Sequence, residues 1–241
     1  MNGDALALVN PRHPLAEEGR PHLAAPDARF PRVLMERRAA ARLRACIARV
    51  GGQGQIVPVS GFRSRAEQQA IWESTLAAEG EAFTRRYVAL PGCSEHQTGL
   101  AIDLALAAEH IDFIRPHFPT QGVCGAFRRA APRFGFILRY PPHKQAITSI
   151  AHEPWHFRYV GAPHALFMQE RGLCLEEYLE LVHAHPWGTP PLRLDTPAGA
   201  YQVGYLPGDA PAPPPEEGWH MQPDNCGGRV LIRRHERRRA V

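Results

Sequence analysis

Apolar residues recur with a helical period in several parts of this chain. Residues 30–50 are expected to form a helix, because apolar side chains late in that segment recur at the i, i+3, i+4 and i+7 positions of one buried face. A second helix is expected to begin after Ser64, which forms a capping-box pattern with Glu67, and to run to about Ala78. Two further helices are expected at residues 165–170 and 175–184.

Four other segments show the short apolar run or the strict alternation that is typical of strands. Residues 56–59 form a short candidate strand that its proline places near a sheet edge, and residues 136–140 form another. Residues 100–106 alternate strictly and place Asp103 on the same face as two alanines. The alternation returns in residues 155–160, which predicts a fourth strand.

The order of these elements favours an α+β fold. Helices and short strands follow each other without regular β-α-β alternation, so we expect a small antiparallel sheet flanked by helices. The composition changes after His185, where proline-rich stretches surround a candidate strand at residues 200–205 and residues 229–232 offer it a partner. We therefore predict a main domain of residues 1–185 and a proline-rich extension of residues 186–241, with a short β-hairpin and a basic tail.

Composition and charge exclude several classes of protein. Of the 241 residues, 44% are hydrophobic and 22% are charged, and no run approaches the roughly 20 apolar residues of a membrane span. The N-terminus lacks the basic and then apolar pattern of a signal peptide, which predicts a cytoplasmic protein. The 5 cysteines form no CxxC pair, as expected of reduced thiols. The net charge of +4 is modest and no RNA-binding or zinc-finger pattern accompanies it, so we expect no nucleic-acid partner.

Candidate chemistry is concentrated in three separated segments. Two imidazoles and one carboxylate, from His96, His156 and Asp103, are a sufficient protein ligand set for catalytic zinc and leave one coordination position open. Glu153 is close enough to His156 in sequence to accept a proton from water at the metal. Arg63 would supply a fixed positive charge for the oxyanion that forms at a scissile carbonyl. The three segments are residues 60–68, 94–103 and 153–156.

A different zinc motif is present in residues 152–156, which read His-Glu-Pro-Trp-His and match HExxH. That motif requires both histidines one turn apart on a regular helix. Pro154 would cost such a helix about 3 kcal/mol, and the residues that follow alternate as a strand. We therefore reject the helical motif and treat His152 as a non-ligand.

The candidate segments resemble the VanY-type D-alanyl-D-alanine carboxypeptidases of peptidase family M15B, which are relatives of the VanX dipeptidases and the VanXY enzymes. Residues 91–104 resemble the SxHxxGxAxD signature of that family. Residues 134–141 and 153–161 resemble its closing blocks. Further similarity lies at residues 8–15 and 175–179.

This resemblance implies the LAS-type, hedgehog-like metallopeptidase fold and one zinc ion held by His96, Asp103 and His156. It also implies that Glu153 is the general base and that Arg63 lies over the carbonyl of the scissile peptide. The implied substrate is a peptidoglycan precursor or muropeptide ending in D-Ala-D-Ala, from which the terminal D-alanine is removed. The residues implied to surround that D-alanine are Gln68, Ser94 and Tyr140, and we expect Trp155 to border the site.

Alternative functions stay open at this point. A D-Ala-D-Ala dipeptidase, an L,D-carboxypeptidase and a peptidoglycan endopeptidase could all use the same zinc centre, and we expect residues 83–90 to shape the pocket. Outside the enzymes, the alternative is an inactive, zinc-stabilised protein that binds the cell wall. The intact ligand set with Glu153 argues against it, because a structural zinc site is normally closed by four protein ligands.

Overall fold

A four-stranded sheet lies at the centre of the fold. The structure is a computed structural model, and it describes residues 5–16, 21–211 and 218–235. The strands of this sheet are β3 (Ile56–Ser60), β4 (Ala101–Leu106), β5 (Phe136–Leu138) and β6 (His156–Tyr159). Their order is β3-β4-β6-β5 and every neighbouring pair is antiparallel, so the predicted α+β class is confirmed and β3 lies at an edge.

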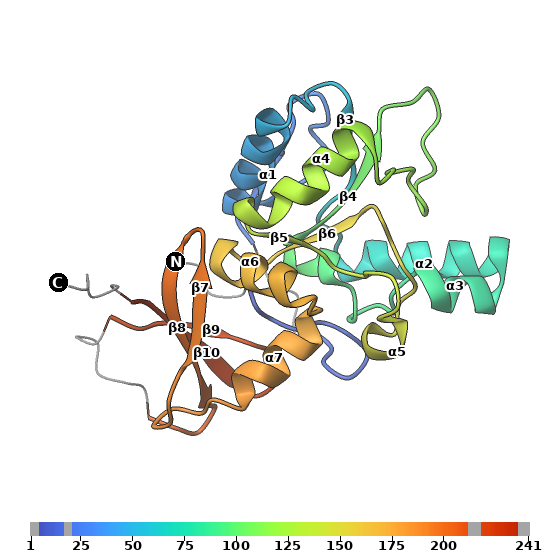
Figure 1. Cartoon of the computed structure of the whole chain (residues 1–241). Coiled ribbons are helices and arrows are strands. Elements are labelled where there is room, and N and C mark those ends of the chain that lie inside the picture. Colours follow the sequence, from blue (N-terminus) through green and yellow to red (C-terminus); the bar gives the residue numbers. More distant parts are fainter. Residues whose placement is uncertain (1–4, 17–20, 212–217, 236–241) are drawn as a thin grey trace.

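Helices surround the central sheet (Figure 1). None of the helices in the described ranges is long and apolar enough to cross a membrane. The helices are α1 (Arg37–Arg49), α2 (Arg65–Glu79), α3 (Glu81–Tyr87), α4 (Gly122–Ala130), α5 (Gln145–Thr148), α6 (Ala162–Arg171) and α7 (Leu175–His183), with 3-10 helices η1 (Glu95–Thr98) and η2 (Ala131–Phe134). Two short strands, β1 (Leu23–Ala24) and β2 (Met35–Glu36), pair with each other ahead of α1.

Helix α1 begins later than the apolar pattern indicated. The two residues of β2 pair with β1, which takes the chain before α1 into an extended conformation. The Glu36 carboxylate then caps the helix by accepting hydrogen bonds from the backbone N–H groups of Arg38 and Ala39, at 3.0 and 2.9 Å. The expected start at residue 30 is therefore wrong, because strand pairing takes precedence over the helical period there.

Helix α2 begins as its capping box predicted. The Ser64 hydroxyl accepts a hydrogen bond from the Glu67 backbone N–H at 3.2 Å, and the Glu67 carboxylate accepts one from the Ser64 backbone N–H at 2.7 Å. This reciprocal pair fixes where the helix starts. It thereby also fixes Arg63, which directly precedes the cap.

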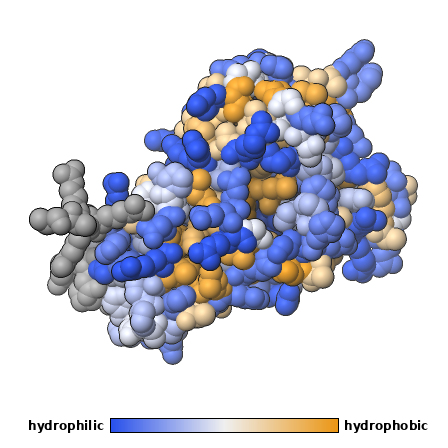
Figure 2. Space-filling view, viewed as in Figure 1, coloured by the Kyte–Doolittle hydropathy of each residue, from blue (hydrophilic) through white to orange (hydrophobic). Residues whose placement is uncertain are grey.

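The two faces of the central sheet have different environments. Ile102 of β4 and Phe157 of β6 are fully buried in one apolar core with Leu43 of α1 and Phe127 of α4. Because successive side chains of a strand alternate between faces, the neighbours of these residues, such as Asp103, lie on the opposite face. Hydrophilic residues dominate the outer surface seen in Figure 2. One face of the sheet therefore packs in the apolar core, and the opposite face carries polar side chains.

The C-terminal region forms a second antiparallel sheet, at the left in Figure 1. Its strands are β7 (Leu192–Thr196), β8 (Gly199–Pro207), β9 (His220–Pro223) and β10 (Gly228–Arg234), in the order β7-β8-β10-β9. The predicted pairing of residues 200–205 with 229–232 is confirmed, with Tyr205 opposite Val230. The predicted hairpin included β8 and β10 but not β7, because the prolines around β7 indicated a loop. The end of the basic tail, residues 236–241, lies outside the described residues.

The C-terminal sheet shares a core with the rest of the chain. Leu194, Val203 and Val230 are buried in one cluster with Leu179 of α7 and with Leu6 near the N-terminus. The boundary between residues 185 and 186 stays a prediction.

Candidate metal centre

Three buried side chains from different elements converge on the polar face of the central sheet. Asp103 of β4 and His156 of β6 are paired directly across the sheet, and His96 comes from η1. One Asp103 carboxylate oxygen (Oδ2) lies 3.2 Å from His96 Nε2, and the other (Oδ1) lies 3.0 Å from His156 Nδ1. The three ligand atoms lie within 4.8 Å of one another, and no other such group occurs in the part of the chain that the structure describes. The sequence-predicted ligands are thus brought together.

Backbone geometry orients the ring of His96. Its Nδ1 lies 2.6 Å from the Gly61 carbonyl, so Nδ1–H donates and Nε2 is left facing Asp103. The residue Gly99, with a φ of 71°, ends η1 in the left-handed conformation and turns the chain into β4. Gly99 therefore turns the chain between His96 and Asp103.

Gly61 is expected to tolerate no side chain. A Cβ atom there would lie 2.1 Å from the Leu34 carbonyl oxygen, which belongs to the backbone and cannot rotate away. We expect Gly61→Ala to lower the free energy of unfolding by about 1–3 kcal/mol and to displace the carbonyl that orients His96. Gly204→Ala is the matched control, because its nearest contact would be an ordinary 3.5 Å. Urea unfolding of both variants checks this; equal stabilities would contradict it.

Glu153 lies beside the predicted ligands. Its Oε2 atom is 3.6 Å from His156 Nδ1, and the side chain is buried. Burial raises the pKa of Glu153 to about 8; the nearby Asp103 carboxylate adds to the rise, whereas His156 opposes it. A carboxyl group with such a pKa can hold or release a proton near neutral pH.

The HExxH helix is absent from this site. Residues 151–155 contain no helix, and His152 is exposed, with its Nδ1 atom 2.9 Å from the Tyr140 carbonyl oxygen. The rejection of the helical motif is confirmed, because Pro154 interrupts any helix and the strand β6 begins at His156.

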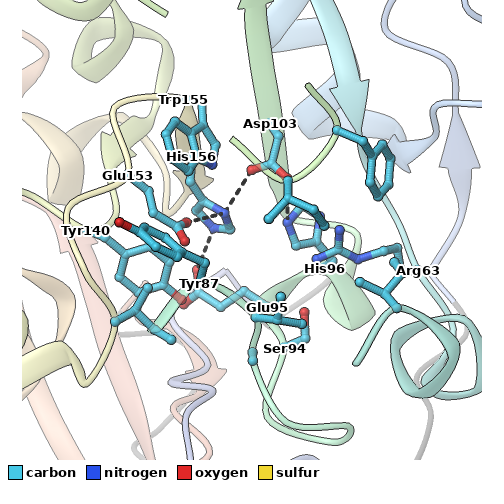
Figure 3. Close-up of a pocket in the computed structure, with 16 residues that line it drawn as sticks. Arg63, Tyr87, Ser94, Glu95, His96, Asp103, Tyr140, Glu153, Trp155 and His156 are labelled. Atoms are coloured by element: carbon cyan, nitrogen blue, oxygen red, sulfur yellow. Dashed lines mark ion pairs between the residues drawn. The ribbon is translucent and has the colours of Figure 1, made fainter. Parts of the chain in front are cut away.

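Arg63 supplies positive charge on the opposite side of the pocket from Glu153 (Figure 3). Its Nη1 atom donates to the Ser60 hydroxyl at 2.9 Å, and its Nε atom has no hydrogen-bond partner within the described ranges. Burial lowers the pKa of His96 to about 4, and the positive charge of Arg63 contributes to this decrease. The lowered pKa favours the neutral imidazole of His96, which is the form that binds a metal ion.

These side chains line one pocket of about 480 Å³, part of which is open to solvent. Ser94, Tyr140 and Trp155 also line it, and their contact with a substrate stays a prediction. Gln68 does not line the pocket: it is fully buried, and its Nε2 atom donates to the carbonyl of Ala89, which is itself a lining residue. Contact between Gln68 and a substrate stays a prediction.

The sequence did not identify several of the residues that line the pocket, and it located others only within a segment. The expected contribution of residues 83–90 comes from Tyr87, Val88 and Ala89, where α3 ends. Phe113 and Ile114 come from the irregular segment after β4, where no periodic pattern marked them. Glu95 also lines the pocket, and its place between Ser94 and His96 was the only available signal.

The chain is similar to a group of characterised peptidases. Residues 32–162 match the family model described as VanY, D-alanyl-D-alanine carboxypeptidase. A bifunctional D-Ala-D-Ala dipeptidase and carboxypeptidase, VanXYC of Enterococcus gallinarum, is 42% identical over 73% of this chain and 93% of its own length. A D-alanyl-D-alanine carboxypeptidase of Enterococcus faecalis is 42% identical over 55% of this chain and 50% of its own length.

Solved structures show the same similarity. The vancomycin-resistance D,D-dipeptidase VanXYg, in complex with a D-Ala-D-Ala phosphinate analogue, has a TM-score of 0.89 and 44% identity, covering 95% of this chain and 93% of its own. A VanY D,D-pentapeptidase in complex with Zn(II) has a TM-score of 0.61 and 33% identity, covering 73% of this chain and 98% of its own.

Proposed function

The chain belongs to the VanY family of D-alanyl-D-alanine carboxypeptidases, and on that basis we propose that it is a zinc enzyme that removes the terminal D-alanine from peptidoglycan precursor peptides. It is a metallopeptidase of the D-Ala-D-Ala carboxypeptidase and dipeptidase type. The observation that carries the proposal is the convergence of His96, Asp103 and His156 beside Glu153 in one pocket.

The donor set fits a single zinc ion. Two imidazole nitrogens and one carboxylate oxygen are a ligand set of catalytic zinc sites, which keep one position open. Asp103 Oδ1 is buried and, apart from its 3.0 Å approach to the other proposed ligand His156, has no hydrogen-bond partner in the described ranges, as expected of an oxygen that binds a cation. When bound, the ion would supply Lewis acidity to the scissile carbonyl and to water. The match to a Zn(II)-bound VanY structure supports this choice of metal.

In the proposed mechanism, Glu153 accepts a proton from the attacking water and later returns it to the amine of the departing D-alanine. Its buried carboxylate lies 3.6 Å from His156, which places it within reach of water at the open coordination position. Arg63 would donate hydrogen bonds to the oxyanion at the scissile carbonyl, and its unpaired Nε–H supports that role. Ser94, Tyr140 and Trp155 would surround the terminal D-alanine.

The substrate length is the finer part of the proposal. A VanYB structure in complex with D-Ala-D-Ala supports recognition of that terminus here. The bifunctional relative favours a second candidate function, hydrolysis of the free dipeptide. An L,D-carboxypeptidase activity has weaker support, from the LdcB structure at a TM-score of 0.57 and 32% identity. An inactive wall-binding role is opposed by the presence of Glu153, and a cytoplasmic location stays a prediction.

We expect D-alanine to be released from the free D-Ala-D-Ala dipeptide and from a pentapeptide ending in D-Ala-D-Ala, but not from a tetrapeptide ending in a single D-alanine. Both preferred substrates carry the same two terminal residues, and in the proposed mode of binding the pocket would enclose the scissile bond that they share. The measurement is kcat/KM for the three peptides with one batch of zinc-loaded protein. Preference for the tetrapeptide would replace the proposal by L,D-carboxypeptidase activity.

A further inference from the structure

A buried ionic cluster lies behind the metal centre, formed by Glu95, Arg139, Arg158 and Glu176. The four side chains are between 0% and 6% exposed. Arg139 Nε and Arg158 Nη1 lie 2.7 and 2.9 Å from the same Glu95 oxygen, Oε1. Arg139 also donates to both carboxylate oxygens of Glu176, at 2.8 and 2.7 Å. Two negative and two positive charges therefore balance inside the fold.

This cluster reaches one of the proposed zinc ligands. The second oxygen of Glu95, Oε2, lies 3.6 Å from Nε2 of His156. Both atoms are buried, and neither has a hydrogen-bond partner in the part of the chain that the structure describes. A buried donor and a buried acceptor that face each other are each costly while unpaired. A shift of about 0.7–0.9 Å from the present 3.6 Å would close a charge-assisted hydrogen bond, whose usual length is about 2.7–2.9 Å.

We propose that Glu95 is a positioning residue for the metal centre: its carboxylate accepts the Nε2–H of His156, so that Nδ1 of the same ring is presented to zinc. This inference rests on the metal site proposed above. Histidine ligands of zinc commonly donate their other N–H to a carboxylate, which fixes the tautomer and the ring orientation. The Gly61 carbonyl orients the other histidine, His96, in the same way, because it lies 2.6 Å from the Nδ1 atom of that ring. The two ligands are thus held by different partners.

The cluster extends the support of His156 to distant parts of the chain. Glu176 lies on α7, and it accepts a hydrogen bond from Asn10 at 3.4 Å. Arg158 donates to the backbone carbonyls of Ala5 and Ala7, at 3.2 and 2.9 Å. Buried ion pairs contribute little net stability, because desolvation offsets their attraction, so geometric positioning explains the cluster better than stabilisation does. The N-terminal segment and α7 therefore help to hold the ligand that β6 carries.

The test compares zinc affinities, measured by competition with a chromophoric chelator, for Glu95→Gln and Glu177→Gln. Glu177 is the residue next to Glu176 on α7, but it pairs with Lys144 at 2.6 Å and does not reach the cluster. We expect Glu95→Gln to weaken zinc binding by about 10- to 100-fold and Glu177→Gln to leave it unchanged. Glu95→Gln should release D-alanine more slowly than the wild-type protein, and this difference should shrink as the zinc concentration is raised, because higher zinc refills the weakened site.

Two further variants separate positioning from loss of stability. Leu43 of α1 is fully buried in the apolar core on the face of the sheet opposite the metal centre. Leu43→Ala therefore destabilises the fold without altering the cluster, and zinc affinity should not change. If Glu95→Gln does not fold, Glu176→Gln replaces it and should weaken zinc binding in the same direction but by less. Wild-type zinc affinity in Glu95→Gln, or in Glu176→Gln where that variant stands in, overturns the inference. Failure of the wild-type protein to bind zinc would instead remove the proposed function itself.

Discussion

Replacing Glu153 by glutamine is expected to reduce turnover of a D-Ala-D-Ala peptide by about 100- to 10,000-fold, the usual range for loss of a general acid-base. The amide keeps the size of the side chain but cannot take a proton from water. The site around it should stay intact, because the side chain makes the 3.6 Å approach to His156, and the amide does not alter the two backbone hydrogen bonds, from the Glu153 N–H to the Tyr140 carbonyl and from the His156 N–H to the Glu153 carbonyl. The measurement is kcat for D-alanine release at saturating zinc.

The neighbouring residue provides the control for this variant. His152→Gln changes the first histidine of the apparent HExxH motif, which is exposed and outside the pocket. We expect its turnover to match the wild-type protein. Near wild-type turnover in Glu153→Gln, or a large loss in His152→Gln, would each contradict the proposed arrangement of the site.

The sequence predicted the convergence of the three proposed zinc ligands, because each of them belongs to a pattern that the local fold preserves. Asp103 was readable from strict alternation with small neighbours, and the antiparallel register then places it opposite His156. His96 was identified from the SxHxxGxAxD signature, and the structure shows that Gly99 of this signature has a positive φ. Pro154 distinguished this site from a helical zinc motif, because a single residue with no backbone N–H decides between helix and strand.

What the sequence missed depends on contacts between segments that are far apart in the chain. Glu95 and Glu176 are separated by 81 residues (176 − 95) and meet only through Arg139, so no local pattern relates them. Phe113 lines the pocket from an irregular segment that has no periodicity to read. Strand β7 was hidden by flanking prolines, since local composition indicated a loop while pairing with β8 makes it a strand.

Removal of the metal is expected to abolish D-alanine release, and added zinc is expected to restore it. In the proposed mechanism neither Glu153 nor Arg63 replaces the Lewis acidity that the ion supplies. Zinc should also stabilise the fold, because the buried ligand atoms converge only in the folded chain and the unfolded chain lacks the site. At free zinc 100 times above its Kd, the free energy of unfolding should rise by about 2.7 kcal/mol.

The measurement pairs an activity assay with thermal unfolding, both after dialysis against a chelator and again after zinc is returned. Asp103→Ala is the matched variant: it removes the carboxylate that faces both His96 and His156, so zinc should restore neither its activity nor its stability. Chelator-treated protein that keeps full activity with no bound metal would contradict the assignment of a zinc centre. A zinc-dependent rise in the melting temperature of Asp103→Ala equal to that of the wild-type protein would place the ion elsewhere, because the only carboxylate of the proposed ligand set would be absent.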